Sequence, residues 1–318
     1  MLSGLRSEAR RVNMQQCEYK NCIIDFIDNS YHHGQLFPFA DAIIFQGGHM
    51  PPKPPVRANR NQTYVFATIE SPQHLALSVG TARWNNAINW TMTYRTDSDI
   101  KYSYGDVIKA RRNITKEKDF AMIFSKKTKD VAWIVSDCNT ESQREKYVSI
   151  LRKYINVDVY GKCGHFKNCS TEVANDCEET IAQDYKFYLS FENSMCTDYM
   201  TEKVYRWFDR DIVSVVRGSR TYQNLLPKGT YIDTSNFQSI SALGKYLKEL
   251  SGNEKHYVNM LREKARHVTV SAASIQQDAY CDICKRLQQP HLYPKQYPSI
   301  KDWWYQETCI KPQDINEY

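Results

Sequence analysis

The sequence predicts an α/β protein of two domains, the second of which is built on a doubly wound parallel sheet. Three observations support this fold class. The chain has 318 residues, which is enough for two domains that each bury a core. In the second half, apolar strand-like segments alternate with helical segments, as in parallel sheets covered by helices. Between the halves, residues 113–129 form a polar, lysine-rich stretch that we expect to be a linker.

Residues 1–112 are expected to form the first domain. Three of its segments, at 40–46, 63–70 and 90–95, are short and rich in aromatic and β-branched residues, which is typical of strands. They predict a small sheet for this domain.

Residues 130–287 are expected to form the second domain, and residues 288–318 an irregular tail. The expected strands lie at 130–136, 157–160, 187–191 and 212–216, and helices are expected from 142, from 201, at 238–250 and, long or broken, at 253–287. A capping box of Ser142 with Glu145 predicts where the first of these helices begins. Because such sheets bind ligands at the carboxyl ends of their strands, we expect the site there.

The composition is that of a folded protein. Hydrophobic residues make up 42% of the chain and charged residues 25%, which excludes a disordered chain. The net charge of +6 suits an anionic ligand such as a diphosphate, but it is too small and too dispersed to predict nucleic-acid binding. No apolar stretch is long enough to span a membrane, and the first residues lack the apolar core of a signal peptide.

The cysteines and glycosylation sequons together predict an oxidising compartment. The chain has ten cysteines and four Asn-X-Ser/Thr sequons, at Asn61, Asn89, Asn113 and Asn168. The competing interpretation is a zinc site at Cys281 and Cys284, but no second pair of ligands with suitable spacing accompanies them. The pairing of ten cysteines does not follow from their spacing.

The densest group of candidate functional residues runs from Phe191 to Lys203. A nucleotide-sugar site needs a cation for the diphosphate, a carboxylate for hydroxyl groups and a ring that packs on the ligand. Lys203, Glu202 and Tyr199 fit these roles within about one helical turn. The alternative is an ordinary helix start with a surface Glu-Lys pair, which the residues alone leave at even odds.

Two further charged residues are candidates at segment ends. Arg144 lies in the first turn of the helix after the strand at 130–136, where a diphosphate would meet the helix dipole. The alternative for Arg144 is a solvated surface residue. Glu70 ends the strand at 63–70 and is a candidate general base, because transfer of a sugar with inversion needs one carboxylate to deprotonate the acceptor hydroxyl. The alternative for Glu70 is a carboxylate that caps a turn.

Two neighbouring motifs read Tyr185-Lys186-Phe187-Tyr188-Leu189-Ser190-Phe191-Glu192-Asn193-Ser194 and Asp198-Tyr199-Met200-Thr201-Glu202-Lys203. Together they closely resemble the signature of the α1,3/α1,4-fucosyltransferase family. Further matches follow in the same order along the chain. They are Glu70-Ser71-Pro72, Asn89-Trp90-Thr91-Met92-Thr93-Tyr94-Arg95, Trp133-Ile134-Val135-Ser136, Val159-Tyr160-Gly161-Lys162-Cys163-Gly164 and Asp302-Trp303-Trp304. The resemblance covers roughly residue 17 to the C-terminus.

The resemblance implies an inverting transferase of GT-B type, with two Rossmann-like domains facing a cleft and GDP-fucose bound by the second. It implies that Glu70 is the general base and that Arg144 and Lys203 neutralise the diphosphate. Asn193, Tyr199 and Glu202 would contact the nucleotide and the fucose. It implies no required metal, although Mn²⁺ can stimulate family members.

The acceptor implied by the resemblance is the 3-hydroxyl of N-acetylglucosamine in the N-glycans of glycoproteins, in the core or in the antennae. The cysteine pattern is similar to that of invertebrate members. The implied location is the Golgi lumen, as the lumenal part of a type II membrane protein whose N-terminal anchor is absent from this sequence. The family's first strand also has no counterpart before Cys17, so we expect the first domain to be incomplete.

The sequence departs from the family pattern at several places. Asp137 stands where an asparagine is usual, Ser214 replaces a proline, and residues 46–49 replace a histidine-rich turn. Asp137 and the altered turn at 46–49 favour an alternative, a catalytically inactive paralogue that still binds GDP or glycan. A secreted disulfide-rich lectin explains the cysteines but leaves Arg144 and Lys203 without a role.

Overall fold

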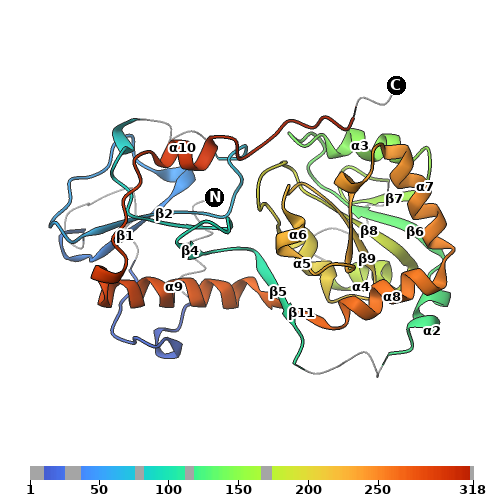
Figure 1. The fold of residues 1–318 in the computed structure, drawn as a ribbon, viewed down its shortest axis with the longest axis horizontal. Helices are drawn as coiled ribbons and strands as arrows, with labels where there is room; N and C mark the ends of the chain where they lie inside the picture. Colours follow the sequence, from blue (N-terminus) through green and yellow to red (C-terminus); the bar gives the residue numbers. More distant parts are fainter. Residues whose placement is uncertain (1–10, 26–36, 76–81, 112–117, 166–173, 316–318) are drawn as a thin grey trace. The chain divides into compact units, whose positions relative to one another are not determined.

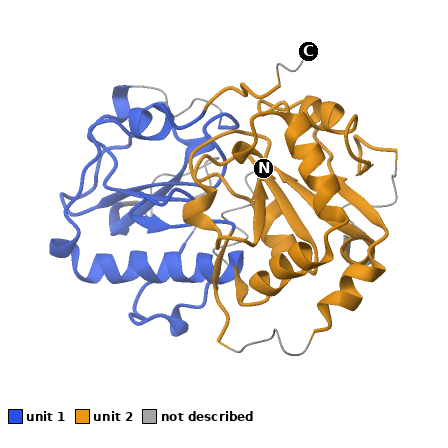
Figure 2. Ribbon diagram, turned by 45° about the vertical axis from the view of Figure 1, so that its right-hand side comes forward, with its two compact units in different colours: residues 1–104, 271–309 blue, residues 105–270, 310–318 orange. Residues whose placement is uncertain are grey.

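The computed structural model describes residues 11–25, 37–75, 82–111, 118–165 and 174–315. The chain forms two compact units, which Figure 2 distinguishes by colour. Unit 1 consists of residues 1–104 and 271–309, and unit 2 consists of residues 105–270 and 310–318. Each unit contains a parallel sheet with its own core, as expected for an α/β protein.

Unit 1 contains a sheet of four parallel strands in the order β1-β2-β3-β4. The strands are β1 (Ala42–Gln46), β2 (Thr63–Thr68), β3 (Trp90–Thr93) and β4 (Ile100–Lys101). Every residue of β2 and β3 is buried, as expected for strands of a parallel sheet that is covered on both faces. The helices are α9 (Ala272–Gln288) and α10 (Ile300–Tyr305), with short 3₁₀ turns at Met14–Gln16, Phe37–Phe39, Gly47–His49, Ala82–Trp84 and Pro290–Leu292.

Helix α9 completes unit 1, whereas the sequence predicts that residues up to 287 belong to the second domain. Its residues Ala279, Tyr280 and Ile283 are buried in one cluster with residues of β2, β3 and β4. The expected long or broken helix at 253–287 is in fact two helices separated by a strand. The chain leaves unit 2 at that strand, so the division of the chain differs from the expected one.

Two disulfides fasten the start of the chain to α9. Cys17 pairs with Cys281, and Cys22 pairs with Cys284. The Cys281-x-x-Cys284 pair is therefore part of a disulfide framework and not a zinc site. A third disulfide joins Cys138 to Cys163, and all nine cysteines in the described part of the chain are disulfide-bonded.

Unit 2 contains a sheet of five parallel strands in the order β10-β9-β8-β6-β7. The strands are β6 (Lys129–Ile134), β7 (Val157–Tyr160), β8 (Tyr185–Phe191), β9 (Val213–Arg217) and β10 (Tyr231–Asp233), and a separate pair is formed by β5 (Gly105–Lys109) and β11 (His267–Ser271). The helices are α2 (Phe120–Lys126), α3 (Arg144–Leu151), α4 (Ala174–Asp184), α5 (Glu202–Phe208), α6 (Tyr222–Leu225), α7 (Ile240–Ser251) and α8 (Glu254–Lys264), with a 3₁₀ turn at Thr234–Asn236.

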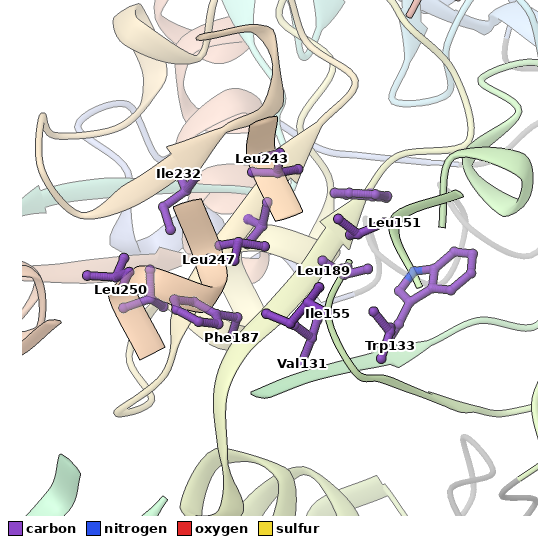
Figure 3. Close-up of a cluster of buried hydrophobic side chains, with 14 of the residues drawn as sticks. Val131, Trp133, Leu151, Ile155, Phe187, Leu189, Ile232, Leu243, Leu247 and Leu250 are labelled. Atoms are coloured by element: carbon purple, nitrogen blue, oxygen red, sulfur yellow. The ribbon is translucent and has the colours of Figure 1, made fainter. Parts of the chain in front are cut away.

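Helices cover both faces of this sheet, as Figure 1 shows. On one face, alternate residues of the central strands pack against α3, α7 and α8, and Figure 3 draws this core with Val131, Phe187 and Leu247. On the other face, Ala132 and Tyr188 pack with residues of α4 and α5. The predicted doubly wound sheet is therefore confirmed for this unit.

Two smaller expectations are corrected. The expected linker contains helix α2, whose first residue Phe120 is 2% exposed and belongs to the core of unit 2. The expected irregular tail contains α10, whose Trp304 is fully buried. No helix in the described ranges is both long and apolar enough to cross a bilayer.

Candidate functional site

The candidate site in unit 2 lies where parallel strands β6, β8 and β9 end. The segment after β6 leads into α3, and the segment after β8 leads into α5 (Figure 1). Ser142 joins these two segments, because its Oγ donates to the Glu192 carbonyl at 2.7 Å and its N–H donates to the Asn193 carbonyl at 3.0 Å. The carboxyl ends of the strands thus carry one connected set of polar residues.

The predicted capping box at Ser142 is wrong. Helix α3 begins after Gln143, which has left-handed backbone geometry (φ 48°) and makes no side-chain capping bond. Glu145 instead accepts a hydrogen bond from Oγ1 of Thr140 at 3.1 Å. The Ser142 hydroxyl is bonded to the segment after β8, and that tertiary bond replaces the local one.

Arg144 is buried, with 4% of its surface exposed, so it is not the solvated residue of the alternative interpretation. Its Nη1 donates to the Phe191 carbonyl at 2.7 Å, and its Nη2 lies 3.4 Å from the Asp137 carbonyl. Within the described residues, its Nε has no hydrogen-bond partner. Burial lowers the pKa of Arg144, while the charges of Glu192 and Asp137 oppose this effect, and a guanidinium stays charged. Arg144 therefore offers a charged donor beside the end of β8.

Lys203 lies in the first turn of α5 and is surrounded by acceptors. Its Nζ is 2.8 Å from Oγ1 of Thr201, 3.2 Å from Oε2 of Glu192 and 3.3 Å from Oε1 of Glu202. Burial acts to lower the pKa of Lys203, but the two carboxylates outweigh it, and the pKa is raised. Lys203 is consequently a firmly protonated cation.

The other three donor-side candidates, Glu202, Asn193 and Tyr199, differ in their exposure. The Glu202 side chain is 48% exposed, and although burial acts to raise its pKa, the charge of Lys203 prevails and lowers it. The Oδ1 atom of Asn193 is buried and, among the residues that the structure describes, has no hydrogen-bond partner. Tyr199 is 1% exposed, so its ring is packed within the loop. Four of the five donor-side candidates therefore lie between the end of β8 and the first turn of α5, and the fifth, Arg144, is the first residue of α3.

Glu70 lies in unit 1, two residues beyond β2. Its N–H donates to Oγ1 of Thr68 at 3.2 Å, and its Oε1 lies 3.4 Å from the hydroxyl of Tyr104. The side chain is exposed. Glu70 thus follows the carboxyl end of a parallel strand, as the sequence predicts for a residue of a functional site.

Sequence reasoning missed two buried charged residues at the site. Glu192 is fully buried and accepts hydrogen bonds from the N–H and the hydroxyl of Thr201 at 2.8–3.0 Å. Arg217, at the end of β9, is 1% exposed and donates to the Ser142 carbonyl at 2.7 Å. Both residues stand directly at the end of an apolar strand, and this position was the signal that could have found them. A charged residue there is buried only when it has partners, so it indicates a polar site at the strand end.

The sequon asparagines differ in their surroundings. Asn61 is exposed in a turn just before β2. Asn89 is partly buried, and its side chain bonds to Arg57, to the Tyr64 N–H and to the Lys295 carbonyl. Asn113 and Asn168 lie outside the described residues.

The arrangement in unit 2 can bind a doubly charged anion. Two cations, Arg144 and Lys203, approach the end of β8 and the segment after it from α3 and α5. Among the described residues, buried polar atoms of Arg144 and Asn193 have no hydrogen-bond partner. Asp137 is exposed in the segment before α3 and adds a negative charge. The geometry suits a diphosphate at the strand ends.

Comparisons with known proteins identify the family. The model of the C-terminal part of glycosyltransferase family 10 (fucosyltransferase) matches residues 124–303, and that of the fucosyltransferase N-terminal part matches residues 4–105. In Drosophila melanogaster, alpha-(1,3)-fucosyltransferase C is 34% identical over 85% of this chain and 67% of its own length. Glycoprotein 3-alpha-L-fucosyltransferase A of the same organism is 34% identical over 83% of this chain, which spans 52% of that relative.

Solved structures confirm the fold. A crystal structure of an alpha1,3-fucosyltransferase superposes with a TM-score of 0.52 at 16% identity, covering 81% of this chain and 77% of that one. A structure of an alpha1,3-fucosyltransferase with GDP superposes with a TM-score of 0.50 and the same coverage. The predicted GT-B-type α/β fold is thereby confirmed. With matches from both of its domain models and from relatives along most of its length, the chain belongs to glycosyltransferase family 10, the fucosyltransferases.

Proposed function

We propose that this chain transfers L-fucose from GDP-fucose to the 3-hydroxyl of N-acetylglucosamine, with inversion at the anomeric carbon. Family membership supports fucose transfer from GDP-fucose. The observation that carries the donor site is the presence of two cations at the strand ends of unit 2: buried Arg144, whose Nε has no hydrogen-bond partner among the described residues, and Lys203. A diphosphate leaving group develops negative charge, and cations held in advance of the reaction stabilise that charge.

In the proposed mechanism, Glu70 is the general base. The acceptor hydroxyl gives its proton to the Glu70 carboxylate while its oxygen attacks the anomeric carbon of fucose. The bond from that carbon to the β-phosphate oxygen breaks on the opposite side, and GDP leaves with both electrons of the bond. Arg144 and Lys203 neutralise the departing diphosphate, and Asn193, Tyr199 and Glu202 contact the nucleotide and fucose.

We further propose that the reaction requires no metal and that Mn²⁺ can stimulate it. Arg144 and Lys203 supply the charge that a bridging metal would otherwise provide. Transfer should persist in EDTA and rise on addition of Mn²⁺. Complete loss in EDTA that Mn²⁺ restores would contradict this part of the proposal.

The proposed acceptors are N-glycans of glycoproteins, with fucose added to core or antennary N-acetylglucosamine. The name of the Drosophila glycoprotein 3-alpha-L-fucosyltransferase A supports a glycoprotein substrate. The proposed location is the Golgi lumen, as the lumenal part of a type II membrane protein. The disulfide bonding of every described cysteine favours such an oxidising compartment.

The test is to incubate the protein with GDP-fucose and a panel of defined N-glycans, and to identify the linkage of any product. An α1,3 linkage to N-acetylglucosamine is expected, and the panel separates core from antennary acceptors.

The second candidate is an inactive paralogue that binds GDP, which the exposed Asp137 in the segment before α3 favours. Calorimetric binding of GDP without any fucose release or transfer would establish that candidate.

A further inference from the structure

Glu192 is a fully buried acidic residue that the proposed mechanism does not use; burial raises its pKa, and the charge of Lys203 opposes that effect. We infer that Glu192 is a positioning residue that acts through Lys203, holding its ammonium group where the donor diphosphate binds. The inference rests on the proposed donor site, because Lys203 has a role in catalysis only if the diphosphate binds there.

The side chain of Glu192 is held in place on several sides. Its carboxylate accepts from the Thr201 N–H at 2.8 Å and from the Thr201 hydroxyl at 2.8 and 3.0 Å. Gly218 packs against its stem, since a Cβ added at Gly218 would lie 2.5 Å from Cβ of Glu192. The Glu192 N–H also donates to the Arg217 carbonyl at 2.8 Å. The carboxylate therefore has a fixed position relative to strands β8 and β9.

This fixed carboxylate constrains a side chain that is otherwise flexible. A lysine ammonium sits on a four-carbon stem with many rotamers. Here Nζ of Lys203 is bonded at once to Glu192, to the Thr201 hydroxyl and to Glu202. Of the two carboxylates, Glu202 is 48% exposed whereas Glu192 is 0% exposed, so Glu192 supplies the rigid end.

The carboxylate of Glu192 faces protein groups and not solvent. Its side chain is fully buried, and Thr201 and Lys203 occupy its oxygens. The competing explanation is structural: Thr201 is the N-cap residue of α5, and Glu192 could serve only to anchor that residue. The two explanations differ in whether the effect of Glu192 passes through Lys203.

A double-mutant cycle separates them. The variants are Glu192→Gln, Lys203→Met and the double variant, and calorimetry measures GDP affinity in each. Glutamine keeps an acceptor for Thr201 but turns an amide donor or a neutral oxygen toward the ammonium. We expect Glu192→Gln to weaken GDP binding at least tenfold when Lys203 is present and less than twofold in the Lys203→Met background.

The outcomes distinguish this inference from the proposed function. Equal losses in both backgrounds mean that the effect of Glu192 does not pass through Lys203, and they overturn the inference. If Lys203→Met leaves GDP affinity unchanged, the proposed donor site itself fails. If Glu192→Gln does not fold, the cycle is run with Glu192→Asp, which keeps the charge but withdraws it from Lys203, and the same criterion of non-additivity applies.

Glu178 provides a matched control in the same unit. It is also a buried glutamate, 4% exposed, and it pairs with Arg206 at 3.0 Å and with Arg210 at 2.8 Å. Glu178→Gln should lower thermal stability but change GDP affinity by less than twofold. A loss of GDP affinity in this control equal to that in Glu192→Gln would show that any buried glutamate of unit 2 has the same effect, which also overturns the inference.

Discussion

Asp314 forms a bidentate ion pair with the guanidinium of Arg217, with Nη2–Oδ1 at 2.7 Å and Nε–Oδ2 at 3.0 Å. The remaining guanidinium nitrogen of Arg217, Nη1, donates to the Ser142 carbonyl. Arg217 is 1% exposed and Asp314 is 39% exposed, so the arginine depends on its partner for charge compensation. A residue near the end of the chain thereby supports the segment between β6 and α3.

Asp314→Ala should destabilise unit 2. The substitution leaves a buried guanidinium without its carboxylate, which costs about 1–3 kcal/mol in unfolding free energy. Urea unfolding of the variant and the native protein measures the difference. Arg266→Ala is the control, because its ion pair with Glu263 is largely exposed and contributes less than about 1 kcal/mol. Equal stability of Asp314→Ala and the native protein would contradict the assigned role.

Glu70→Gln should reduce fucose transfer without weakening GDP binding. Loss of a general base lowers the rate by about 10²–10⁴-fold. The donor-side residues all belong to unit 2, whereas Glu70 belongs to unit 1, so GDP affinity should stay within twofold of the native value. Steady-state kinetics and calorimetry on one protein preparation measure both quantities. Unchanged turnover would remove Glu70 from the mechanism.

Lys264 should make the stability of unit 2 depend on pH. Its Nζ donates to the carbonyls of Trp207, Arg210 and Ile212, and burial lowers its pKa from 10.5 to about 7. The unfolded chain therefore binds a proton between pH 7 and 10 that the folded chain does not bind. As a result, the contribution of Lys264 to the unfolding free energy rises with pH in this window, by at most about 1.4 kcal/mol per pH unit, and falls toward pH 7.

The check is to measure urea unfolding of the native protein and of Lys264→Met at pH 7, 8 and 9. The difference in unfolding free energy, native minus variant, should grow as the pH rises. A constant difference across the three pH values would mean that the pKa of Lys264 is the same in the folded and unfolded chain.

Asn61 should carry an N-glycan when the protein is made in a secretory pathway. Its side chain is exposed, and its N–H donates to Oδ1 of Asn59 in the turn before β2. Asn61→Gln should therefore lose the mass of one glycan and keep its thermal stability. Asn89→Gln is the informative comparison, because it breaks three hydrogen bonds of the fold and should cost about 1–3 kcal/mol. Glycopeptide mass spectrometry that finds Asn61 unmodified would refute the first expectation.

Elements with a strong local pattern were predictable from the sequence. The strand expected at 157–160 matches β7, and the helix expected from 201 matches α5, whose apolar residues Val204, Trp207 and Phe208 are buried at positions i, i+3 and i+4. Thr201 was expected at the start of that helix and is its N-cap residue. In these cases, burial and capping depend on residues within one or two turns of each other.

Elements that depend on distant partners were not predictable. Ser142 bonds to the Glu192 carbonyl, 50 residues away in the sequence, and nothing in the local spacing of Ser142 and Glu145 reveals this partner. Arg217 likewise depends on Asp314, 97 residues later. Helix α9 was assigned to the wrong neighbour because an amphipathic pattern reports that one face is buried, but not which sheet covers it.

The pairing of Cys17 with Cys281 and of Cys22 with Cys284 has a consequence for synthesis on the ribosome. Unit 1 needs α9 for its core, yet residues 105–270 are made before that helix exists. Unit 2 thus has nearly its whole sequence available before α9 is made, whereas the early strands of unit 1 cannot complete their core until then. The first cysteines must remain reduced, or be released from other partners, until the late ones arrive, so maturation of this enzyme should depend on thiol exchange in the compartment where it folds.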